Sequence, residues 1–141
     1  MADHDKLLLA LADRCKVASG VERKLDGDIA DAFKLVPPWV SSRDNPEWAS
    51  WSGGRDHWEA PFFTGRIDDA LTLMPSGVRR VEFGTYAGGD GAWAYVHIPD
   101  DRVGQVEGCA TEPLALTEAI LRALAGEQPA YLNNPENVDV K

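Results

Sequence analysis

The stretch that decides the fold is T-G-R-I-D-D-A-L-T-L-M-P-S-G, residues 64–77. Thr64 is a residue type that caps helices through its side-chain oxygen, and Pro75 to Gly77 end a helical pattern. Between these ends, apolar residues recur at three- and four-residue spacing: Ile67, Ala70, Leu71 and Met74. We therefore predict a short helix that joins a helical, Trp-rich half of the chain to a half made of strands and a last helix.

Two amphipathic helices are predicted before this stretch. From Asp3 to Ala18, the apolar residues form one stripe: Leu7, Leu8, Leu11, Ala12, Cys15 and Ala18. Ser19-Gly20 end this helix, and Val21 to Leu35 repeats the pattern. Helices joined by so short a turn pack as an antiparallel hairpin, which we place at residues 1–35. The second helix carries an acidic set that is interpreted as a solvated surface: Glu22, Asp26, Asp28 and Asp31.

A Trp-rich loop is predicted at residues 36–63. Pro37-Pro38 break the helical pattern, and the residues that follow show neither helical nor strand periodicity. Four tryptophans fall in this loop: Trp39, Trp48, Trp51 and Trp58. Loops longer than about 12–15 residues are uncommon in small domains and are often functional. We treat the four tryptophans as candidate binding residues, with the alternative that they cover the core beneath the loop.

Strands and a last helix are predicted on the C-terminal side. Alternating or β-rich segments lie at residues 78–85, 92–98 and 103–109. Thr111 can cap a helix that Gly126 ends. The predicted fold class is therefore α+β, a single domain over residues 1–126 with an α-β-β-β-α core at 64–126. Its three-stranded antiparallel sheet is layered against helices, and residues 127–141 form a polar tail.

Composition restricts the classes of partner. A chain of 141 residues with 44% hydrophobic residues can bury one core, and its net charge is -9. Such a surface repels nucleic-acid phosphates and anionic membranes and favours a basic partner. No apolar run reaches the length of a membrane span, so a cytoplasmic protein is predicted. Cys15 and Cys109 are isolated thiols and are interpreted as small buried hydrophobes.

Residues with metal-binding or catalytic chemistry are scattered. His57, within R-D-H-W-E at residues 55–59, is the only histidine with neighbouring carboxylates. His4 and His97 are distant in sequence, so no matching ligand pair is present. No metal, cofactor or catalytic residue is predicted, although a small hydrolase-like enzyme with a site near His57 stays an alternative.

The order of elements from residue 64 onward is also that of double-stranded RNA-binding domains. Such domains need lysine or arginine at the start of the last helix to meet phosphates, and this chain has Glu112 there. Direct binding of nucleic acid is therefore not predicted.

Two segments carry a resemblance to a known family: F-F-T-G-R-I-D-D-A-L-T-L-M-P-S-G at 62–77 and A-T-E-P-L-A-L-T-E-A-I-L-R-A-L-A at 110–125. Together with L-L-A-L-A-D-R-C-K-V-A-S-G at 8–20 and E-R-K-L-D-G-D-I-A at 22–30, they resemble small phage and prophage proteins with the phage ABA-sandwich domain. The resemblance implies an α-β-α layered fold and a viral or prophage origin. It implies no activity and no catalytic residues.

The favoured hypothesis is a phage- or prophage-derived accessory protein that acts without catalysis. It would bind a basic host or phage protein through the Trp-rich loop and its acidic surroundings. Two alternatives stay open: a homodimer formed through the same tryptophans, and an acidic inhibitor that mimics nucleic acid on a host factor.

Overall fold

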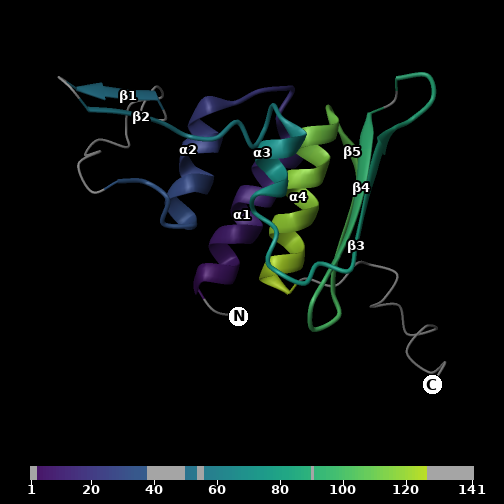
Figure 1. Cartoon of the computed structure of the whole chain (residues 1–141). Coiled ribbons are helices and arrows are strands. Elements are labelled where there is room, and N and C mark those ends of the chain that lie inside the picture. Colours follow the sequence, from purple (N-terminus) through teal and green to yellow (C-terminus); the bar gives the residue numbers. More distant parts are fainter. Residues whose placement is uncertain (1–2, 38–49, 54–55, 90, 127–141) are drawn as a thin grey trace.

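The computed structural model describes residues 3–37, 50–53, 56–89 and 91–126 (Figure 1). Within these ranges the elements are α1 (Asp3–Val17), α2 (Arg23–Ala32), β1 (Ser50–Gly53), β2 (Asp56–Glu59), α3 (Ile67–Leu71), β3 (Arg80–Thr85), β4 (Ala92–Ile98), β5 (Arg102–Cys109) and α4 (Glu112–Ala125).

The main sheet is antiparallel, with strand order β3-β4-β5. Val96 in the central strand pairs with Val81 on one side and with Gly104 on the other. The helices lie on one face of this sheet, and the other face points away from them (Figure 1). The predicted α+β fold, with a three-stranded antiparallel sheet layered against helices, is confirmed.

Helix α4 is the centre of the molecule. Thr111 caps it, because its Oγ1 accepts a hydrogen bond from the Leu114 backbone N at 3.4 Å, and Gly126 ends it in the left-handed region with φ 80°. The helix lies between the sheet and helices α1 and α3 (Figure 1). It is consequently buried on nearly all sides, at Leu114, Ala115, Leu116, Thr117, Glu118, Ala119, Ile120, Leu121, Ala123 and Ala125.

The sheet and α4 approach each other closely because small residues face each other. The inward side chains of β4 include Ala92 and Ala94, both buried. In β5, a Cβ added to Gly104 would lie 1.9 Å from the Ala119 carbonyl oxygen, so only glycine fits there. This glycine therefore sets how near the central helix lies to the sheet.

The N-terminal helices form the predicted hairpin. Helices α1 and α2 run in opposite directions and pack together (Figure 1). Two residues of the predicted apolar stripes are nevertheless exposed: Leu7 in α1, and Val21, which precedes α2. The second helix is also shorter than predicted, since Glu22 occupies its N-cap position.

The stretch at residues 64–77 forms a much shorter helix than predicted. Helix α3 begins after Arg66, and Thr64 does not cap it. Instead, the Thr64 Oγ1 accepts a hydrogen bond from the Glu22 backbone N at 2.9 Å, and the Thr64 N donates to Asp26 Oδ1 at 2.8 Å. A tertiary contact with α2 has therefore replaced the local cap.

The prediction that Asp26 belongs to a solvated acidic surface is wrong. Asp26 is fully buried, and its second oxygen accepts a hydrogen bond from Arg23 Nη1 at 2.7 Å. Arg23 also donates to the Ala60 carbonyl at 2.7 Å and stacks on the Phe62 ring. Burial raises the pKa of Asp26, against the opposing effect of these hydrogen bonds. This carboxylate is a structural link between α2 and the segment that leads into α3.

The predicted loop at residues 36–63 contains regular structure. Strands β1 and β2 form an antiparallel hairpin in which Trp51 is opposite Trp58. Gly53-Gly54, between two short segments with aromatic residues, is a sequence signal for a hairpin that the loop prediction did not use. Each of these strands has only four residues, which is too short for an alternating pattern to be recognised in the sequence.

Candidate functional site

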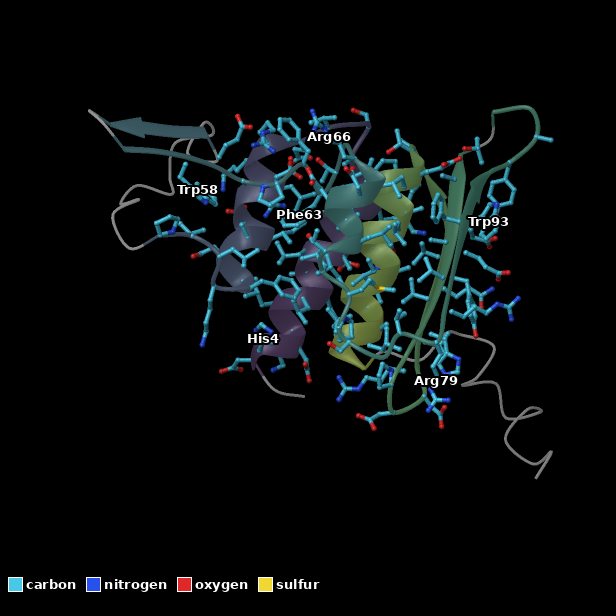
Figure 2. All side chains as sticks on the ribbon, in the orientation of Figure 1. His4, Trp58, Phe63, Arg66, Arg79 and Trp93 are labelled. Carbon is cyan, nitrogen blue, oxygen red and sulfur yellow. The ribbon has the colours of Figure 1, made fainter. Side chains whose placement is uncertain are left out.

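The face of the main sheet that points away from α4, here called the outer face, carries the candidate site. Along β4 the buried side chains alternate with Trp93, Tyr95 and His97, which are half-buried. Figure 2 shows Trp93 projecting from the sheet on the side opposite to the helices. The part of the chain that the structure describes places no helix or strand over this face.

The position of the Trp93 indole follows from its neighbours. Trp93 pairs with Gly84 in β3 and with Glu107 in β5. A Cβ at Gly84 would come within 3.0 Å of the indole Cζ2, so the ring lies directly over the glycine backbone. Gly108, with φ 81°, accompanies an irregularity in the pairing of β5 that directs Glu107 outward and Cys109 inward.

The outer face is hollowed beside these rings. A groove of about 260 Å³ is lined by side chains from all three strands and the turn after β3, here called the outer groove: Glu82, Tyr86, Trp93, Tyr95, Gln105 and Glu107. A second hollow of about 620 Å³ adjoins it and shares Tyr86 and Glu107. These two residues therefore stand at the junction of a longer depression.

Two residues that line the outer groove, Glu82 and Tyr95, contact a cation of the chain itself. The Arg80 Nη2 lies 2.8 Å from Glu82 Oε1, and its guanidinium lies 5.6 Å from the centre of the Tyr95 ring. The Glu82 carboxylate is thereby neutralised beside an aromatic ring.

The outer groove is also lined by a carboxylate whose described partner is a hydroxyl. The Tyr86 hydroxyl donates to Glu107 Oε2 at 2.8 Å, and this hydrogen bond raises the pKa of Tyr86. Lys16 donates to the Glu107 backbone carbonyl and not to its carboxylate. Within the described residues, no cation lies in ion-pair range of the Glu107 carboxylate.

The tryptophans predicted as binding residues lie elsewhere. Trp39 and Trp48 fall outside the described residues. Trp51 is described only by its place in β1, opposite Trp58. Trp58 is half-buried and packs against the hydrophobic core. For Trp58, the arrangement agrees with the alternative that a loop tryptophan covers the core.

Sequence reasoning missed the outer groove. The alternation at residues 92–98 predicts a strand, and it puts Trp93, Tyr95 and His97 on one face without indicating whether that face is covered. The available signal was the opposite face, where Ala92 and Ala94 alternate with the aromatics. Small residues on one face of a strand indicate that a helix packs closely against that face. Large aromatic residues on the opposite face are then available to contact a partner.

The two thiols are structural. Cys15 and Cys109 are free and fully buried, as predicted. Burial raises the pKa of Cys15, and burial together with a hydrogen bond to Glu118 raises the pKa of Cys109 to about 12. Glu118 is itself buried and accepts a hydrogen bond from Arg122 Nε at 2.7 Å. This cluster neutralises a charge inside the core and offers no reactive thiolate.

Metal-ligating side chains do not converge in the described residues. Of the side chains placed there, no three His, Cys, Asp or Glu residues are arranged to hold a metal ion. His97 meets the exposed Asp101 at 3.4 Å, and the His57 side chain is outside what the structure describes. In the same ranges, no helix combines the length and the apolar character needed to cross a membrane.

Comparisons with protein-family models, curated proteins and solved structures gave no match.

Proposed function

We propose that this chain is a phage- or prophage-derived accessory protein that acts as a non-enzymatic protein-binding module. Its docking surface is the outer face of the β3-β4-β5 sheet. The observation that supports this proposal is the pair of large aromatic side chains, Trp93 and Tyr95, beside a hollow on a sheet face that no described element covers. Aromatic anchors next to a pocket are typical of binding hot spots.

Charge favours a basic protein as the partner. The net charge of -9 disfavours nucleic acid, and the outer groove is lined by Glu107, whose carboxylate has no cation of the described residues in ion-pair range. A basic partner would be drawn toward such a surface before it makes contact with the rings.

The proposal does not rest on the four tryptophans of the Trp-rich loop. Trp58 is half-buried against the core, and the side chains of Trp39, Trp48 and Trp51 lie outside what the structure describes. The proposed docking surface is therefore the outer face, whose side chains are described, and binding through the loop tryptophans stays a prediction.

A matched pair of arginine substitutions tests the proposal. Gln105 is exposed and lines the outer groove, so Gln105→Arg introduces a long cationic side chain there without removing a core contact. Leu35 is exposed and follows α2 in the sequence, and α2 lies away from the sheet (Figure 1), so Leu35→Arg adds the same charge elsewhere. Proteins captured from a host lysate by the tagged full chain would be compared by quantitative mass spectrometry.

The expected result is a partner that is lost with Gln105→Arg and retained with Leu35→Arg. Capture that both variants preserve equally would remove the outer face from the proposed function. Circular dichroism of both variants would establish that each is folded.

A further inference from the structure

The lining of the outer groove includes two pairings of a carboxylate with an aromatic ring, and one of them contacts a cation of the chain itself. In the first, Glu82 and Tyr95 hold the Arg80 guanidinium. In the second, Glu107 lies beside the rings of Tyr86 and Trp93, and no cation of the described residues pairs with its carboxylate. The Arg80 contacts therefore indicate that a guanidinium can also be bound by Glu107 and its neighbouring rings.

From this comparison we infer that the Tyr86–Trp93–Glu107 half of the outer groove binds an arginine or lysine side chain from an extended basic segment of the partner. The inference rests on the proposed function and names the chemistry of the partner. A cation placed over an aromatic face and next to a carboxylate gains from both groups.

The three residues are held in place by contacts of different kinds. The Trp93 indole lies over the Gly84 backbone, which fixes one wall. The Tyr86 hydroxyl donates to Glu107 Oε2 at 2.8 Å, which orients the carboxylate and the second ring together. Glu107 also has an oxygen to which no described donor is bonded, so a cation can be accepted there without breaking the Tyr86 contact.

The size and position of the site fit a side chain on an extended peptide. Tyr86 and Glu107 stand where the two hollows of about 260 and 620 Å³ meet, so the site continues beyond the outer groove. At the opposite end of the sheet lie Arg79 and Arg80 (Figure 2). This separation of charge would orient a basic segment with its cationic side chain at the acidic end.

A second copy of this chain fits the site less well. Each copy carries a net charge of -9, so two copies repel each other as they approach. A basic segment is attracted by the same charge and supplies the cation that Glu107 lacks among its described partners.

Direct binding of defined peptides tests the inference. A fluorescein-labelled oligoarginine peptide, an oligolysine peptide and a Gly-Ser peptide of the same length would be titrated with the full chain by fluorescence anisotropy. The variants are Glu107→Gln, which removes one negative charge in the groove, and Tyr86→Leu, which removes one exposed ring. Asp68→Asn is the matched control, because Asp68 is exposed on α3, which packs on α4 on the helical side of the molecule.

The wild type is expected to bind the cationic peptides and not the Gly-Ser peptide. Glu107→Gln is expected to weaken binding about fivefold, or about 1 kcal/mol, whereas Asp68→Asn should weaken it less than about twofold. Tyr86→Leu should also weaken binding, and this loss should persist at a salt concentration that screens exposed charges.

Three outcomes would overturn the inference. The first is equal weakening by Glu107→Gln and Asp68→Asn, which would indicate long-range attraction without a site. The second is no binding of the cationic peptides at all. The third is concentration-dependent dimerisation in light scattering that Tyr86→Leu abolishes, which would make a second copy the occupant. If Gln105→Arg still removes a captured partner in any of these cases, the proposed function stands and this inference alone fails.

Discussion

Substitution of Gly104 by Ala should destabilise the protein strongly, because it separates the sheet from its central helix. The added Cβ would lie 1.9 Å from the Ala119 carbonyl oxygen and 2.7 Å from its carbonyl carbon. Both atoms belong to the backbone of a buried helix, so no flexible side chain can move aside. A tolerable contact of 3.0 Å requires the two elements to move apart locally by about 1.1 Å.

The magnitude follows from the packing on both sides of α4. Overpacking a core costs typically about 1–3 kcal/mol, and sometimes more. Here the displaced helix also contacts α1 and α3, so its movement disturbs a second interface. We expect a loss of about 3 kcal/mol or more, a large fraction of the 5–15 kcal/mol that is typical of a domain.

Urea unfolding followed by circular dichroism measures this loss as a lower midpoint with an unchanged slope. Gly20→Ala is the control, because nothing lies within 4 Å of a Cβ there and its φ is not left-handed. That variant should be neutral or more stable by up to about 1 kcal/mol. A Gly104→Ala protein within about 0.5 kcal/mol of wild type would refute the close approach of β5 and α4.

Two further predictions concern titratable groups. Cys15 and Cys109 are buried with raised pKa values, so neither should react with a thiol reagent in the native protein, and both should react in urea; rapid native reaction would contradict their burial. Glu107→Gln should lower the raised pKa of Tyr86 toward the ordinary value of about 10, as measured by ultraviolet difference titration against Tyr86→Phe. Because the pKa of Tyr86 is raised in the folded protein, the stabilising contribution of the neutral hydroxyl is present below the ordinary pKa and is lost as the pH rises through the folded pKa. An unchanged Tyr86 titration in Glu107→Gln would show that the hydrogen bond to Glu107 does not cause the raised pKa.

Helix boundaries could be predicted from the sequence where the capping contacts are made by neighbouring residues. Thr111 and Gly126 lie at the ends of α4, where the sequence places them, because capping involves only neighbouring residues. Thr64 is the same kind of signal, yet its hydroxyl accepts from the backbone of Glu22, far away in the sequence. A threonine hydroxyl can accept a hydrogen bond from the next helix or from a backbone N–H that is distant in the sequence. The sequence alone does not indicate which of these donors the fold brings near.

The candidate site could be predicted only in part, for a related reason. The alternation in β4 shows that Trp93 and Tyr95 share a face. Which face is covered depends on where α4 packs, and that depends on Gly104 and the small inward residues of the sheet. Composition drew attention to the Trp-rich segment, where Trp58 is half-buried and packs against the core.

The central position of α4 has a consequence for how the protein is made. Residues 112–125 leave the ribosome after every other described element, yet α1, α3 and the sheet all pack on this helix. Until then, the growing chain exposes the inner surfaces that α4 will cover. Stable folding must therefore wait until synthesis has passed α4, and in that interval the nascent chain is most exposed to chaperones, proteases and aggregation.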